Sequence, residues 1–136
     1  MFLTFDTETT GLPKNFNAPV SESENWPRLV QLAWQLNDNN GRLISVNSHI
    51  IKPDGYSIPY NSEKIHGIST EIALKEGKKL GDILKDFEKD LLRSKYIIGH
   101  NIKFDINIVG AEHYRKNFKS SIEDKLKIDT AIISKS

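Results

Sequence analysis

The sequence predicts a single domain with a mixed α/β fold, on the strength of two observations. Residues 2–51 contain three stretches suited to strands, and the Asn40-Gly41 pair between the second and third is a typical hairpin turn. Residues 80–130 alternate between apolar residues at helical spacing and short apolar runs. An antiparallel three-strand meander followed by helix, strand, helix and strand would form one mixed sheet with flanking helices, an order that right-handed crossovers permit.

Composition limits the kind of protein that this can be. A chain of 136 residues is long enough for one domain with its own core. The 19 basic and 18 acidic residues nearly cancel, which excludes a wide basic surface. It does not exclude an enzyme that grips only a strand end, because bound metal ions would supply positive charge there. Since the chain has no cysteine and no apolar segment of transmembrane length, we expect a cytoplasmic protein without disulfides, thiolate chemistry or membrane contact.

The first predicted strand ends in two carboxylates. Residues 2–5 (FLTF) favour a half-buried strand, and the strand period of two places Asp6 and Glu8 on one face. Paired carboxylates repel each other unless a cation neutralises them, and their hard oxygens suit Mg²⁺ or Mn²⁺. The alternative is that acidic residues simply end a strand at a solvated turn. Residues 9–11 (TTG) then offer small side chains and a flexible backbone, whose N–H groups can meet a sugar or a phosphate.

The middle of the chain completes the meander. Residues 13–27 are polar and predict a surface loop, which either flanks a substrate cleft or is a variable insertion. Residues 30–36 alternate in polarity and predict the second strand, with Trp34 in the core. The return strand is expected over residues 42–51, closed by Pro53.

A connection and two helices are expected next. Residues 53–69 predict irregular connecting structure, in which His66 is either a hydrogen-bonded loop histidine or a substrate contact. Ser69 is a suitable cap for a short helix that runs to Leu74 and ends at Gly77. The longer helix that follows has an apolar stripe, and its charged residues form a solvated face. That stripe consists of Leu80, Ile83, Leu84, Phe87 and Leu91.

The last part of the chain predicts strand, helix and strand. Residues 96–99 (YIIG) are a short apolar run typical of a buried strand. Asn101 is a good N-cap for the next helix, whose opening turns hold Asp105, where the positive helix end favours an ionised carboxylate. Taken alone, Asp105 would be an ordinary helix-start aspartate. Residues 126–130 predict the final strand.

Three segments resemble the DnaQ-like, or DEDD, 3′→5′ exonucleases, a family that includes the proofreading epsilon subunit of bacterial DNA polymerase III. Residues 6–12 (DTETTGL) are similar to the family's first motif. Residues 65–68 (IHGI) resemble its Val/Ile-His-Gly-Ile segment, and residues 100–105 (HNIKFD) resemble its second motif, His-Asn-x-x-Phe-Asp. The resemblance implies a ribonuclease H-like fold.

The resemblance also implies the roles of individual residues. Asp6, Glu8 and Asp105 would be the catalytic residues and would hold two Mg²⁺ or Mn²⁺ ions. The same likeness implies a set of contacts to the terminal nucleotide. That set consists of Thr9, Thr10, Leu12, Asn61, His66, Asn101 and Phe104. The implied activity is metal-dependent release of nucleotides from the single-stranded 3′ end of DNA, with RNA as another possible substrate. A role in proofreading or repair would make a polymerase subunit a possible partner.

One family motif is missing. A histidine or tyrosine general base and a fourth aspartate are expected after the last strand, and no such segment follows Thr130. We therefore expect residues 1–136 to be one exonuclease domain truncated at its C-terminus, without C-terminal helices and inactive or weakly active alone. The alternative is a catalytically silent module on the same fold that binds nucleic acid or protein.

Overall fold

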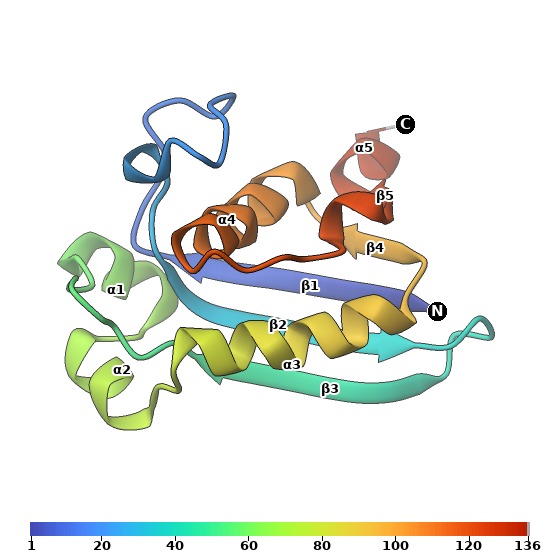
Figure 1. The fold of residues 1–136 in the computed structure, drawn as a ribbon, viewed down its shortest axis with the longest axis horizontal. Helices are drawn as coiled ribbons and strands as arrows, with labels where there is room; N and C mark the ends of the chain where they lie inside the picture. The colour runs from blue at the N-terminus through green and yellow to red at the C-terminus, as the bar shows by residue number, and fades with distance from the viewer. Residues whose placement is uncertain (136) are drawn as a thin grey trace.

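The computed structural model describes residues 1–135, with side-chain surroundings for residues 1–132, and contains one five-stranded sheet in that part of the chain. The strands are β1 (Phe2–Thr9), β2 (Leu29–Asn37), β3 (Leu43–Ile50), β4 (Tyr96–Gly99) and β5 (Leu126–Asp129). Their order is β3-β2-β1-β4-β5 (Figure 1). The pairs β1–β2 and β2–β3 are antiparallel, whereas β1–β4 and β4–β5 are parallel. The predicted meander and mixed sheet are therefore confirmed.

Two long helices cover one face of this sheet. The α-helices are α1 (Tyr60–His66), α2 (Thr70–Glu76), α3 (Leu80–Arg93), α4 (Ile102–Arg115) and α5 (Thr130–Lys135), and single 3₁₀ turns lie at Ser23–Asn25 (η1) and Ile122–Asp124 (η2). Phe87 of α3 packs against Phe5 of β1, and α4 is bonded to Thr7 of the same strand. Because Phe5 and Thr7 point to the same side of β1, α3 and α4 share that side, as Figure 1 shows.

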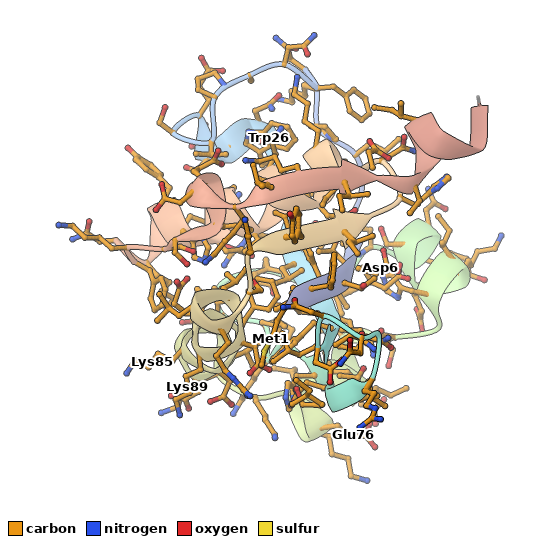
Figure 2. All side chains as sticks on the ribbon, turned by 90° about the vertical axis from the view of Figure 1, so that its right-hand side faces the viewer. Met1, Asp6, Trp26, Glu76, Lys85 and Lys89 are labelled. Carbon is orange, nitrogen blue, oxygen red and sulfur yellow. The ribbon has the colours of Figure 1, made fainter. Side chains whose placement is uncertain are left out.

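The helical predictions around α2 and α3 are confirmed. Ser69 caps α2, since its hydroxyl accepts the Ile72 N–H at 3.0 Å. All five apolar residues of the predicted α3 stripe are buried. Lys85 and Lys89 extend from α3 into solvent (Figure 2). The α2–α3 junction requires glycine at position 77, because a Cβ there would lie 2.3 Å from the Ala73 carbonyl oxygen.

Three predictions about local structure are wrong. Residues 60–66 form α1 instead of an irregular connection. This helix of 7 residues, bounded by Pro59 and by Gly67 in the left-handed conformation, is too short for an apolar period to show. The last strand ends at Asp129, because Thr130 already begins α5. The expectation that no helix follows the last strand therefore fails as well.

The core lies between the sheet and these helices. Its members include Leu3, Leu36, Phe87 and Ile97, all fully buried. Trp34 is also buried in this cluster, as predicted, and its indole N–H donates to Asp90 at 2.9 Å. Over the residues that the structure describes, we find no helix both long and apolar enough to cross a membrane.

Candidate active site

A pocket of about 580 Å³ lies where β1 meets the first turns of α4. It contains five residues that the sequence assigns to the site, namely Asp6, Leu12, Asn101, Phe104 and Asp105. The remaining lining residues come from β1, the loop after it, α4 and the end of β5. They are Thr7, Phe16, Asn17, Trp26, His100, Lys103, Asn107 and Asp129. The structure therefore brings the two motifs together from opposite ends of the chain.

Asp105 is the buried carboxylate of this pocket. It is 6% exposed, and its Oδ1 accepts a hydrogen bond of 2.5 Å from the Thr7 hydroxyl. Burial raises the pKa of Asp105 to about 6, an effect that the Thr7 hydroxyl opposes and the nearby charge of Asp6 increases. Asp129 is the third carboxylate in the lining of this pocket, and Lys103 is its basic residue.

Asp6 is exposed and lies on the opposite face of β1 from Thr7. Glu8 shares that face by strand alternation, but it does not line the pocket, and the β1–β2 register shifts directly after it. No cluster of three potential metal-ligating side chains is present among the described residues.

Asn101 occupies the predicted N-cap position without acting as a side-chain cap. Its backbone is left-handed, with φ of 54°, and its side chain makes no capping bond. Instead its backbone N–H donates to Oδ1 of Asp129 at 3.0 Å, an oxygen that also accepts the Ala131 N–H. The prediction of a capping side chain is therefore wrong, and Asp129 secures the turn between β4 and α4.

Four predicted substrate contacts lie outside the pocket. Thr9 donates its hydroxyl to the Gly11 carbonyl at 2.7 Å, and the Thr10 carbonyl accepts the Ser62 hydroxyl at 2.6 Å. The second bond fastens α1, which carries Asn61 and His66, to the loop after β1. The two threonines and these α1 residues thus belong to adjoining segments, although none of the four reaches the pocket lining.

His66 has one ring nitrogen in use and one free. Its Nδ1 accepts the Ile68 N–H at 3.1 Å, so the neutral ring carries its proton on Nε2. Nε2 is buried and has no hydrogen-bond partner within the described part of the chain. The ring therefore retains an unused donor next to the loop after β1.

The loop between β1 and β2 forms one wall of the pocket through Phe16, Asn17 and Trp26. Phe16 lies 6.3 Å from the Phe104 ring, measured between centroids. Arg115 of α4 holds the loop by donating to the carbonyls of Ser23 and Trp26, at 2.5 and 2.7 Å. Of the two interpretations of this segment, the structure favours a loop that flanks the cleft. Only its length and its position after the first motif pointed to this role in the sequence.

Replacing Asp105 by Asn should stabilise the protein above pH 6 when no metal is present. The folded state holds this proton more tightly than the unfolded chain, so the wild type loses stability as the pH rises from about 4 to about 6. We expect Asp105→Asn to gain about 1–3 kcal/mol at pH 8 and almost nothing at pH 4, the lower figure allowing for screening by water in an open pocket. Urea denaturation in EDTA at the two pH values measures this. The exposed Asp124→Asn serves as the control, and an equal gain at both pH values would contradict the assignment.

Comparisons with known proteins agree with this geometry. The RNase T family model, described as exonuclease, matches residues 3–136. The 3′-5′ exonuclease DinG of Bacillus subtilis (strain 168) is 28% identical over 134 residues, which is 98% of this chain and 13% of DinG. The chain therefore spans only a small part of that relative.

Solved structures share the fold. E. coli Exonuclease I in complex with a dT13 oligonucleotide has a TM-score of 0.73 at 23% identity, covering 94% of this chain and 27% of that chain. Exonuclease X in complex with 5′ overhanging duplex DNA has a TM-score of 0.58 at 22% identity, covering 79% of this chain and 53% of that chain. Because the family model covers almost the whole sequence, the chain belongs to the RNase T family of DnaQ-like, or DEDD, 3′→5′ exonucleases, with the ribonuclease H-like sheet that its motifs predicted.

Proposed function

We propose that this chain removes nucleotides from the 3′ end of single-stranded DNA by metal-dependent hydrolysis, and that its rate is low when residues 1–136 act alone. The observation that carries the proposal is the meeting of Asp6 and Asp105 in one pocket, with Asn101 and Phe104 of the second motif in its lining. The pocket lies at the end of β1, where a strand end has access from solvent. Exonuclease I is a relative in fold that has been captured with DNA oligonucleotides, which supports DNA over RNA as the substrate.

The chemistry of the carboxylates fits Mg²⁺ or Mn²⁺. Asp6 and Asp105 offer hard oxygen ligands, and burial together with the neighbouring Asp6 raises the pKa of Asp105, so a bound cation would stabilise the charged form of both. We propose that Asp6, Asp105 and Glu8 together hold the ions. When bound, such ions activate the attacking water and stabilise the leaving 3′ oxygen.

Other residues of the chain would bind and orient the terminal nucleotide. Leu12 and Phe16 are 75% and 53% exposed at the pocket, which suits apolar and stacking contacts with bases. The Nε2–H of His66 is buried without a partner among the described residues, and we propose that it donates to a phosphate or ribose oxygen after the side chain moves on nucleotide binding. The Ser62–Thr10 bond joins the loop that carries Thr9 and Thr10 to the helix that carries Asn61. We propose that these three residues contact the nucleotide as it enters the pocket. The biological role that we propose is proofreading or repair, with a polymerase as partner.

A second candidate is a silent binding module that uses the same pocket without hydrolysis. It is favoured by the position of Glu8 outside the pocket and by the lack of a three-ligand cluster within residues that the structure describes. Such a module would bind a strand end and leave its length unchanged. The two candidates therefore differ in the product formed.

An internally labelled linear single strand should be shortened stepwise in the presence of Mg²⁺ or Mn²⁺, with mononucleotides as products. A circular single strand of the same sequence should persist, because a pocket of this size accepts an end. Gel electrophoresis and chromatography of the products measure both outcomes, and a reaction in EDTA is the control. Cleavage of the circle would indicate an endonuclease, and unchanged linear DNA bound by the protein would support the silent module.

A further inference from the structure

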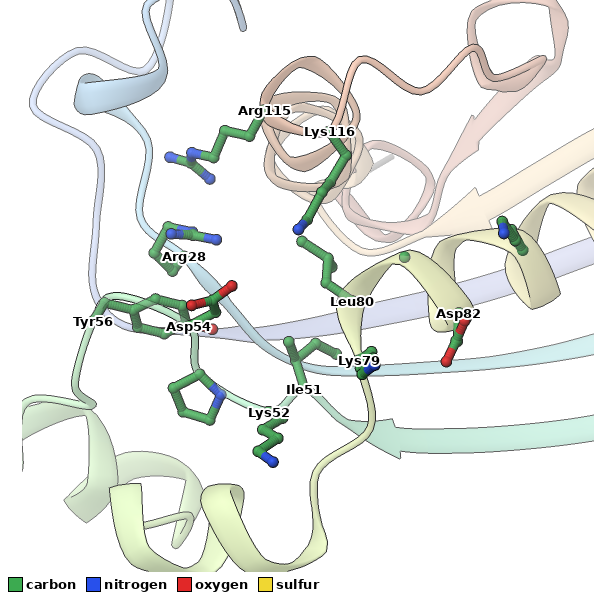
Figure 3. Close-up of a pocket in the computed structure, with 13 residues that line it drawn as sticks. Arg28, Ile51, Lys52, Asp54, Tyr56, Lys79, Leu80, Asp82, Arg115 and Lys116 are labelled. Carbon is green, nitrogen blue, oxygen red and sulfur yellow. The ribbon is translucent and has the colours of Figure 1, made fainter.

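A second cavity, of about 670 Å³, lies at the other end of α4 from the candidate active site. It is formed by the start of α3, the end of α4, the start of β2 and the segment after β3 (Figure 3). Its lining consists of Arg28, Ile51, Lys52, Pro53, Asp54, Tyr56, Lys79, Leu80, Gly81, Asp82, Lys85, Arg115 and Lys116. We call it the basic cavity. No residue of the active-site pocket lines it, and the helical rise along α4 separates the two by roughly 18 Å.

The basic cavity concentrates positive charge that the chain as a whole does not carry. Six lysines and arginines line it against two aspartates, whereas the net charge of the chain is +1. Lys52, Lys79, Lys85 and Lys116 make no ion pair and no side-chain hydrogen bond with any residue that the structure describes. Such a concave group of unpaired cations attracts anions.

Arg28 is held in one orientation inside this cavity. Its Nε donates to both oxygens of the fully buried Glu112 at 3.3 Å, and its guanidinium stacks 4.3 Å from the centre of the Tyr56 ring. Tyr56 is fixed in turn by its hydroxyl, which donates to the Leu29 carbonyl at 3.1 Å. The two terminal nitrogens of Arg28 have no partner among the described residues. A fixed guanidinium with two free donors matches two oxygens of one phosphate.

The cavity is also joined to the loop after β1. The Arg28 N–H donates to the Thr10 hydroxyl at 2.9 Å, and the Thr10 N–H donates to the Arg28 carbonyl at 3.0 Å. Thr10 is one of the predicted contacts to the terminal nucleotide. These two bonds therefore connect the basic cavity to the loop that is predicted to contact the terminal nucleotide.

We propose that the basic cavity binds the phosphodiester backbone of a nucleic-acid strand, upstream of the 3′ end that lies in the active-site pocket. Arg28 binds one phosphate of the strand. Lys79, at the start of α3, and Lys116, at the end of α4, neutralise the neighbouring phosphates. At a stacked rise of about 3.4 Å per nucleotide, the distance along α4 corresponds to about five nucleotides. This inference rests on the proposed function, since it assigns a second contact to the same substrate.

The experiment measures binding of labelled oligothymidylates by fluorescence anisotropy in EDTA, which prevents hydrolysis. The strands have about four and about sixteen nucleotides, so that by the estimate above only the longer one spans both sites. The variant is Lys79→Gln with Lys116→Gln, because these side chains have no structural partner, unlike Arg28. The matched control is Lys75→Gln with Lys89→Gln, two exposed lysines outside the cavity.

The variant should bind the longer strand about five- to tenfold more weakly and the shorter strand unchanged. The slope of log affinity against log salt should fall by about 1.4, because each phosphate contact on a single strand contributes about 0.7. The control pair should match the wild type for both strands.

Three results would overturn the inference alone: an unchanged affinity of the variant for the longer strand, an equal loss in the control pair, or an equal loss for the shorter strand. Loss of thymidine monophosphate binding to the same degree would identify a site for free phosphate and would likewise overturn the assignment to a strand. A longer strand that is bound through the cavity lysines but is not shortened in Mg²⁺ or Mn²⁺ would overturn the proposed function and leave the assignment of the basic cavity in place.

Discussion

Asp6→Ala should abolish Mg²⁺-dependent shortening of single-stranded DNA while the protein remains folded. Asp6 is exposed and lines the same pocket as the buried Asp105, and we propose both as metal ligands. Loss of a residue that hydrogen-bonds to a metal ligand typically lowers metal affinity or activity by about 10–100-fold. Loss of a ligand itself should therefore lower the rate by at least about 10²-fold. The measurement is the initial rate of mononucleotide release, with circular dichroism to confirm folding.

The exposed Asp124→Ala is the matched control for Asp6→Ala and should retain the full rate. A readout that needs no turnover accompanies the assay, namely the rise in Tm on titration with Mn²⁺. That rise should be present in the wild type and much smaller in Asp6→Ala, because bound ligand stabilises only the folded state. A folded Asp6→Ala variant with the parent's rate and the parent's Mn²⁺ response would show that Asp6 holds no ion.

Glu112→Gln should lower the free energy of unfolding by about 3–5 kcal/mol, a large part of a typical total of about 5–15 kcal/mol. Glu112 is fully buried, and its carboxylate is paired with Arg28 and with Arg115, the latter at 2.8 Å. It also accepts the Leu29 N–H at 2.9 Å. Glutamine keeps the shape of the side chain but leaves two arginine charges without their counterion.

Urea denaturation at pH 7 measures this loss, and Glu123→Gln is the control because Glu123 is exposed and its carboxylate makes a 3.9 Å contact with Lys127. The control should change stability by less than about 1 kcal/mol. A loss of under 1 kcal/mol in Glu112→Gln would mean that the buried cluster is not what fixes the start of β2 against α4.

The elements of the fold could be predicted where side-chain period decides the structure. The alternation in β1 and β2 and the stripe on α3 each bury one face, so their burial is legible in the sequence. Helix α1 is bounded by Pro59 and Gly67. With 7 residues, it is too short for a repeat of apolar side chains to mark it in the sequence. Asn101 has the right residue type for a cap, yet the bond from its N–H to Asp129 holds the backbone left-handed.

The candidate site was predictable only in the parts that its motifs carry. Asp6 and Asp105 are marked by motif position, whereas the contribution of Phe16 and Trp26 depends on how a long loop folds back. The importance of Glu112 was equally hidden, because a glutamate in a helix usually faces solvent and its arginine partners come from distant positions. The position of Glu8 outside the pocket could not be predicted either, because strand period places it on the same face as Asp6 and does not encode the register shift that follows Glu8.

Trp26 lines the same pocket as Asp6, so its fluorescence can serve as an intrinsic reporter of this site. The chain has two tryptophans. Both are buried in the core cluster, and each is 3% exposed. The Trp34 indole N–H donates to Asp90, whereas the Trp26 indole N–H donates to the Pro19 carbonyl at 3.1 Å, and of the two Trp26 alone lines the active-site pocket. We therefore expect the ultraviolet emission of Trp26 to change when the pocket is occupied, whereas the emission of both tryptophans should change on unfolding. With Trp34→Phe, the remaining fluorescence would follow the entry of an ion or a strand end without any attached dye.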